Sequence, residues 1–197
     1  MQIIKKINTS AAIALDSNGE EIVVFGKGIG FPKVPYNLED LSKIERTFYN
    51  VDSKYYNIIT SLPPEILMMS ADIVEEAEVE LDNKLNHNLT ITLADHLNFA
   101  IERFRNGINL VSPISYDVSH LYPKEYAIGE KALEKLRAEL QIDLPQQEAI
   151  SITMHLINAE SETGNLKELL KTNRIIQGIT EIVEKYFDVK INLDSYD

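Results

Sequence analysis

The 197-residue sequence contains no cysteine, which excludes disulfide bonds and thiolate metal sites and fits a reducing cytoplasm. No apolar run approaches the roughly 20 residues that a membrane-spanning helix needs. The N-terminal stretch lacks the layout of a secretory signal peptide, because its apolar segment AAIAL is short and is soon followed by acidic residues. We therefore expect a cytoplasmic protein without a membrane partner.

Basic residues are scarce relative to acidic ones: 19 Lys and Arg stand against 31 Asp and Glu, and the formal net charge is -12. Residues 1–56 hold seven residues of each sign, so the other 12 basic and 24 acidic residues carry the whole net charge. Because phosphate binding requires cationic groups, only the neutral N-terminal part is expected to contact nucleic acid. The difference in charge predicts two domains with different roles.

The first 50 residues predict a small β-sheet. Short apolar segments at 2–8, 11–15 and 44–50 are strand candidates, and 21–31 has the pattern of a strand pair interrupted by glycines. Asn18-Gly19 predicts a hairpin turn, because tight hairpin turns need a positive φ.

The segment Ile22-Val23-Val24-Phe25 is apolar throughout, although successive residues of a strand point to opposite faces. A small sheet with two apolar faces must cover both. We expect the sheet to cover one face by folding on itself, and a second copy of the chain to cover the other. The sequence therefore predicts a homodimer.

From about residue 57 the apolar spacing becomes helical. It predicts helices over 63–81, 93–104, 123–140, 145–160 and 167–187. The predicted fold class is α+β, with a small antiparallel, barrel-like sheet domain over 1–56 followed by an all-α helical bundle over 57–170. Residues 171–197 are expected to open a further domain.

The glycine-rich stretch GKGIGF, residues 26–31, allows three interpretations. A nucleotide-binding loop is disfavoured, because the glycine spacing does not match the dinucleotide fingerprint and Pro32 follows in place of a helix. A strand with a bulge is the simplest alternative. In the third interpretation the glycines let a nucleic-acid backbone approach, Lys27 contacts phosphate and Phe31 stacks on an unpaired base. Three further lysines lie nearby in the sequence and would enlarge this patch: Lys5, Lys6 and Lys33.

Two of the four histidines, His96 and His155, lie at the edges of predicted apolar helix faces. The simplest interpretation is that each is a hydrogen-bonded, partly buried residue. The spacing of neither histidine fits a helical zinc site, and no Gly-x-Ser-x-Gly turn supports a catalytic serine, so we expect no metal, cofactor or catalytic residue. A histidine can also serve as a switch, since its charge changes near neutral pH and its ring nitrogen can accept a phosphoryl group.

Four motifs occur in a characteristic order: VVFGKGIGF, LADHLNFAIERFRNG, LYPKEYAIGEKAL and LPQQEAISITMHLINAE. Together they resemble the transcriptional antiterminators of the BglG/LicT/SacY type, and the resemblance covers essentially the whole chain. It implies an RNA-binding co-antiterminator domain over 1–56 that dimerises through its sheets. A first PTS regulation domain over 57–170 and the first helix of a second one over 171–197 would follow.

The resemblance also implies a function. Such a protein binds a hairpin in the leader of a sugar-utilisation messenger RNA and prevents an overlapping terminator from forming. The sugar phosphotransferase system controls it by phosphorylating histidines, with an enzyme II as donor and HPr as a further candidate. An RNA-binding regulator of this kind is not an enzyme.

Site residues follow from the same resemblance. The implied RNA contacts are Lys5, Ser10, Gly26, Lys27, Gly28, Phe31 and Lys33. The implied phosphoacceptors are His96 and His155, with three neighbours that shape their sites: Asp95, Arg103 and Asn158.

Two other classes of protein remain open. A phosphohistidine carrier or histidine-dependent enzyme, with an N-terminal part that serves only for dimerisation, would transfer phosphate to a small molecule. A DNA-binding regulator is disfavoured, because no helix-turn-helix pattern precedes residue 57.

Overall fold

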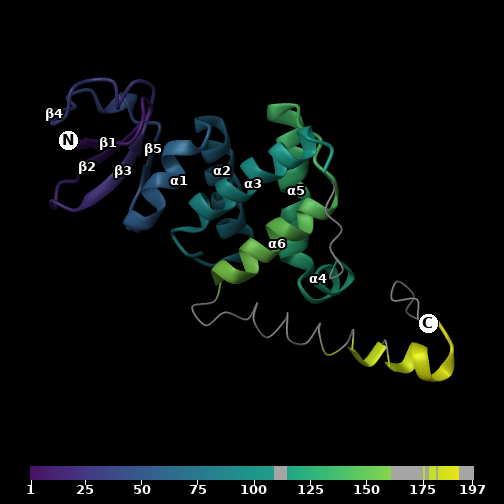
Figure 1. Cartoon of the computed structure of the whole chain (residues 1–197). Helices are drawn as coiled ribbons and strands as arrows, with labels where there is room; N and C mark the ends of the chain where they lie inside the picture. Colours follow the sequence, from purple (N-terminus) through teal and green to yellow (C-terminus); the bar gives the residue numbers. More distant parts are fainter. Residues whose placement is uncertain (109–114, 161–174, 176–177, 181, 191–197) are drawn as a thin grey trace. The chain divides into compact units, whose positions relative to one another are not determined.

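The computed structural model describes residues 1–108, 115–160, 175, 178–180 and 182–190 (Figure 1). The chain forms two compact units. The first contains residues 1–76 and 86–100, and the second contains 77–85 and the described residues from 101 onward. Since the units share two helices, the sequence-based domain limits at residues 56 and 170 stay a prediction.

The first unit contains a five-stranded antiparallel sheet in the order β4-β1-β2-β3-β5. Its strands are β1 (Gln2–Lys6), β2 (Ala11–Leu15), β3 (Glu21–Phe25), β4 (Tyr36–Asn37) and β5 (Arg46–Phe48). The strands predicted within 2–8, 11–15 and 44–50 are therefore confirmed.

The hairpin predicted at Asn18-Gly19 is also confirmed, and it connects β2 with β3 through residues 16–20. Gly19 has a φ of +82°. The Asp16 side chain accepts hydrogen bonds from the backbone N–H groups of Asn18 and Glu20, at 2.8 and 2.9 Å. The turn thus combines a left-handed glycine with a side-chain acceptor, a common way to stabilise turns.

The prediction of a second strand within 21–31 is wrong. After β3 the chain turns twice: the Ile29 N–H donates to the Gly26 carbonyl, and the Phe31 N–H donates to the Gly28 carbonyl. Gly28 has a φ of +77°, a conformation that an extended strand does not contain. The segment therefore forms turns after the end of β3.

One face of the sheet packs against the segment that follows β3. Its buried cluster comprises Ile3, Ala12, Ala14, Ile22, Val24, Ile29 and Leu38. The first five belong to strands, while Ile29 and Leu38 come from residues 26–44. The sheet therefore folds on itself on this side, as the sequence predicted.

The other face of the sheet is buried within the same chain. Ala11 pairs with Phe25 and Ile13 with Val23, so these four side chains share a face, and none is more than 3% exposed. The expectation that a second copy must cover this face is wrong, because one chain already buries it. The homodimer itself stays a prediction.

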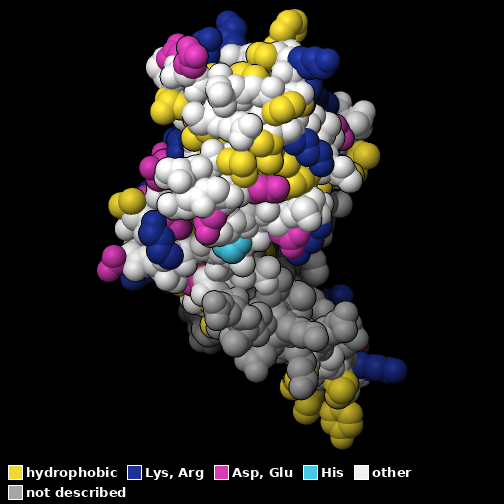
Figure 2. Space-filling model, turned by 90° about the vertical axis from the view of Figure 1, so that its left-hand side faces the viewer, with side chains coloured by type: hydrophobic (Ala, Val, Ile, Leu, Met, Phe, Trp, Pro, Cys, Tyr) yellow, Lys and Arg dark blue, Asp and Glu magenta, His cyan; other side chains and the backbone are white. Residues whose placement is uncertain are grey.

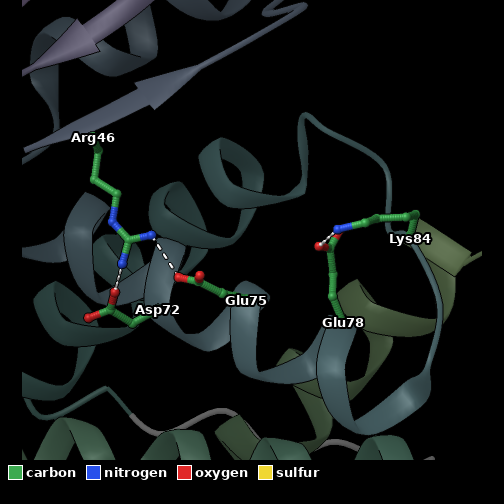
Figure 3. A network of polar contacts seen from close by, with 5 residues as sticks. All are labelled: Arg46, Asp72, Glu75, Glu78 and Lys84. Carbon is green, nitrogen blue, oxygen red and sulfur yellow. Dashed lines mark hydrogen bonds and ion pairs between the residues drawn. The ribbon is translucent and has the colours of Figure 1, made fainter.

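Two helices of the first unit lie on this second face: α1 (Tyr56–Ser61) and the part of α2 (Pro64–Leu81) that belongs to this unit, up to residue 76. Burial raises the pKa of the Tyr56 hydroxyl, and Glu21 of β3 raises it further. The Arg46 guanidinium reaches from β5 to Asp72 and Glu75 of α2, as Figure 3 shows. The hydrogen bond with Glu75 raises the pKa of Arg46, and Asp72 contributes to this shift.

The second unit is helical. After α3 (Leu89–Arg105), which both units share, it contains α4 (Ser115–Leu121), α5 (Pro123–Leu140) and α6 (Gln147–Glu160). Helices α5 and α6 approach closely at Gly129, where a Cβ atom would lie 2.5 Å from the Ala149 carbonyl oxygen. An apolar cluster of Val118, Ile150 and Ile157 ties α4 to α6.

The helices predicted over 63–81, 93–104, 123–140 and 145–160 are confirmed, and so is the α+β fold class. Helix α4 was not predicted, since its seven residues are too few for a clear apolar period. The helix predicted over 167–187 lies largely outside the described residues, although 178–180 and 182–187 are helical. None of the helices in the described part of the chain is both long and apolar enough to cross a membrane.

Candidate functional site

The turn over residues 26–31 is fastened to the loop between β1 and β2. The Gly26 N–H donates to the Ser10 carbonyl at 2.9 Å, and the Gly30 N–H donates to the Thr9 carbonyl at 3.1 Å. The Ser10 N–H in turn donates to the Asn8 side chain at 2.8 Å. The structure therefore brings together Ser10 and the glycine-rich stretch, which the resemblance had assigned to one RNA surface.

The three glycines of the turn are required for different structural reasons. A Cβ atom on Gly26 would lie 1.8 Å from the Lys43 carbonyl oxygen, and one on Gly30 would lie 1.8 Å from the Asn8 carbonyl oxygen. Both glycines are buried and permit close backbone packing inside the chain. Of these three glycines only Gly28 is exposed, and a Cβ atom on it would have no other atom within 4 Å, so only Gly28 offers bare backbone to a ligand.

Two exposed side chains accompany Gly28. Lys27 is exposed, and Phe31 is exposed by 80%, although burying an aromatic ring is strongly favourable. A cation beside an open backbone and an unburied aromatic ring suits a phosphate next to an unpaired base. Lys33, two residues after Phe31, is also exposed.

Lys5 is placed differently from the other candidates. It pairs with Ile13 across β1 and β2 and so belongs to the second face of the sheet. Its ammonium lies 5.9 Å from the centre of the Tyr56 ring, within the range of a cation–π contact. The structure thus places the Lys5 ammonium beside α1. On the face drawn in Figure 2, basic side chains stand in separate groups rather than in one continuous patch.

His96 lies on α3 in the first unit and is half-buried. Its Nε2 atom is buried. In this orientation of the ring, Nε2 is closed to solvent. Asp95 is exposed, and as the preceding helical residue it points about 100° away from His96.

His155 lies on α6 in the second unit and is also half-buried. Asn158 follows it by almost one helical turn and is exposed, so the two side chains lie on neighbouring parts of one helix surface. Each histidine thus occupies the border between buried and exposed faces that the sequence predicted.

Arg103, assigned to the surroundings of His96, has its own partner. Its Nη2 atom lies 2.9 Å from Oε1 of Glu148, which belongs to the first turn of α6. The side chains are 18% and 7% exposed, so this is a largely buried ion pair between α3 and α6. The sequence analysis did not identify Glu148. The sequence held one indication that Glu148 is buried: it comes immediately before the buried apolar residues Ala149 and Ile150.

Comparisons with known proteins agree with these features. The family model of the CAT RNA binding domain matches residues 1–57, and that of the PRD domain matches residues 71–159. Transcription antiterminator LicT of Bacillus subtilis (strain 168) is 31% identical over 199 residues, covering 99% of this chain and 72% of LicT. The Beta-glucoside operon antiterminator of Dickeya chrysanthemi is 33% identical over 198 residues, covering 98% of this chain and 68% of that protein.

A solved structure, the crystal structure of GlcT CAT-PRDI, superimposes with a TM-score of 0.67 at 27% sequence identity. It covers 82% of this chain, and this chain covers 99% of it. The matched family models, an RNA-binding domain over 1–57 followed by a PRD domain over 71–159, define a two-part regulator in which an RNA-binding module precedes a regulatory one. The chain belongs to the family of transcription antiterminators that carry a CAT RNA-binding domain and a PRD domain. The resemblance seen in the sequence is confirmed, and the phosphocarrier alternative is not favoured.

Proposed function

We propose that this chain is an antiterminator that binds a hairpin in the leader of a messenger RNA and keeps a transcription terminator from forming. The observation that carries this proposal is the turn over residues 26–31. This turn contains the exposed Lys27, the open backbone of Gly28 and Phe31, whose side chain is 80% exposed. The names of the relatives support the same function.

In this proposal Phe31 stacks on an unpaired base and Lys27 contacts phosphate. Ser10 and Lys33 extend this surface. Gly26 fixes the turn through the hydrogen bond of its N–H to the Ser10 carbonyl. Lys5 joins this surface only if its side chain leaves Tyr56. We further propose that two copies of this surface act together in a homodimer.

The proposed control is phosphorylation of His96 and His155 by the sugar phosphotransferase system, with an enzyme II as donor and HPr as a second candidate donor. Each phosphoryl group adds between about one and two negative charges. Because the part of the chain after residue 56 is already acidic, these charges disfavour close packing of the helices there and repel the phosphates of RNA. Asp95 and Asn158 border the two sites on their exposed sides, and Arg103 anchors α3 near the first.

The setting follows from the function. A protein that acts on a nascent messenger and receives phosphate from the phosphotransferase system works in the cytoplasm, with no membrane partner. The proposed limits are a co-antiterminator domain over 1–56, a PTS regulation domain over 57–170, and the start of a second such domain over 171–197. The proposal assigns the chain no enzymatic turnover.

The test begins with selection of an RNA hairpin from a randomised library by the full chain. Binding of this hairpin is then compared with binding of duplex DNA. We expect hairpin binding without DNA binding, and a loss of about 1–3 kcal/mol of binding free energy for Phe31→Ala. Lys27→Ala should weaken binding and reduce its salt dependence. Failure to select a hairpin, or unchanged affinity in both variants, would contradict the proposal.

A further inference from the structure

One side chain braces the turn over residues 26–31. Five backbone N–H groups of this turn donate hydrogen bonds. Four of them donate to backbone carbonyl groups: Gly26, Ile29, Gly30 and Phe31. The fifth, Lys27, donates to Oε1 of Glu45 at 3.3 Å. The Lys27 bond is therefore the one among these five that a side-chain substitution can remove.

Glu45 is itself held firmly beside the turn. Its N–H donates to the Phe25 carbonyl at 2.8 Å, directly before Gly26. The preceding 3₁₀ turn, Leu41–Lys43, is capped by Asp40, and hydrogen bonds from Ser42 lower the pKa of that carboxyl group. Glu45 thus contacts the chain on both sides of Gly26, through its backbone at Phe25 and through its side chain at Lys27.

The negative charge of Glu45 is unfavourable at this position if the turn binds RNA. Its side chain is exposed next to Lys27, where a carboxylate repels the phosphates of a bound RNA. A neutral amide could accept the same hydrogen bond without that repulsion. The hydrogen bond to the Lys27 backbone is the structural role that the residue performs at this place.

We infer that Glu45 is a positioning residue for RNA binding, which holds the Lys27 backbone and thereby orients the Lys27 side chain and the open backbone of Gly28. This inference rests on the proposed function. Glu45 does not need to touch RNA. It reduces the freedom of the turn before binding, so that less conformational entropy is lost when RNA binds.

Three substitutions in the full chain separate the hydrogen bond from the charge, with the hairpin selected by the wild type as the probe. Glu45→Gln and Glu45→Ala both remove the charge, but only Glu45→Gln keeps an acceptor. We expect Glu45→Gln to bind at least as tightly as the wild type, and Glu45→Ala to bind about five-fold more weakly than Glu45→Gln. Glu45→Asp is one methylene shorter and keeps the charge, so it should bind more weakly than Glu45→Ala, because it loses the hydrogen bond and retains the repulsion of phosphate.

Glu39, an exposed carboxylate in the same part of the chain, provides the matched control. Its Ala and Gln variants should bind the hairpin with equal affinity. Thermal midpoints of all variants check that the comparison concerns folded protein. Equal affinities of Glu45→Ala and Glu45→Gln, while Phe31→Ala still weakens binding, would overturn the role of Glu45 alone. Failure to obtain a hairpin, or an unaffected Phe31→Ala, would overturn the proposed function as well.

Discussion

At the scale of the residue, the main feature is one largely buried ion pair, between Arg103 and Glu148. Glu148 is 7% exposed and its partner Arg103 is 18% exposed, whereas most ion pairs of the described residues lie at the surface. Removing two charges from water is costly, and their mutual attraction compensates only while both are present. Such a pair is therefore sensitive to the loss of one member.

Glu148→Ala should destabilise the folded chain by about 3 kcal/mol, because it leaves the Arg103 guanidinium buried without a counter-charge. Chemical denaturation measures this difference. Glu80→Ala, which breaks the exposed pair with Lys131, is the matched control and should cost less than about 1 kcal/mol. Equal losses in the two variants would show that the Arg103–Glu148 pair is no more important than a surface contact.

At the scale of the element, α2 is the link that covers the second face of the sheet and continues into the helical unit. Asp72 and Glu75 are three residues apart and so share one helix face. Both reach Arg46 of β5 (Figure 3). Because the guanidinium presents several donors in a fixed plane, one arginine can bind both carboxylates.

The double variant Asp72→Asn/Glu75→Gln should loosen the contact between α2 and the sheet. Each amide is a weaker partner for Arg46 than a carboxylate, so we expect a loss of about 1 kcal/mol, given that these side chains are partly exposed. Hydrogen exchange should become faster in β5 and in the middle of α2, around the two substituted residues. Glu65→Gln, an exposed residue in the first turn of α2, should leave this exchange unchanged. Unaltered exchange in the double variant would contradict the role of the contact.

At the scale of the whole molecule, the distribution of charge separates binding from regulation. Residues 1–56 are neutral, and the net charge of -12 lies after them. A neutral domain can bind RNA if its lysines stand where phosphates pass. The acidic remainder of the same chain lowers the electrostatic potential that attracts RNA, so we expect binding to weaken with each added negative charge.

Phosphotransfer tests the proposed regulation. Incubation with purified phosphotransferase-system proteins and labelled phosphoenolpyruvate should label the wild type. His96→Ala and His155→Ala should each reduce the label, and the double variant should lose it. Labelled wild type should bind the selected hairpin more weakly, since phosphate repels phosphate. His87→Ala, at an exposed histidine, is the control and should keep the full label. Label that persists in the double variant would show that other histidines are the acceptors.

Much of this molecule follows from local sequence patterns. The period of apolar residues predicts α2, α3, α5 and α6, because a helix forms from contacts between residues three or four apart. Asn18-Gly19 predicts the hairpin because its turn depends only on these neighbouring residues, which readily adopt a positive φ. The four motifs identify the family, and they locate both histidines at the borders of helix faces without any knowledge of packing.

Other features depended on the tertiary structure, because they arise between residues distant in the sequence. The apolar run Ile22–Phe25 shows that two faces need cover, but only the fold shows that the same chain covers both. Arg103 and Glu148 form an ion pair although they are 45 positions apart in the sequence, and Lys27 and Glu45 share a hydrogen bond although they are 18 positions apart. The glycines of 26–31 mark a special backbone, but only neighbouring backbone atoms decide that Gly26 and Gly30 pack inward while Gly28 stays open.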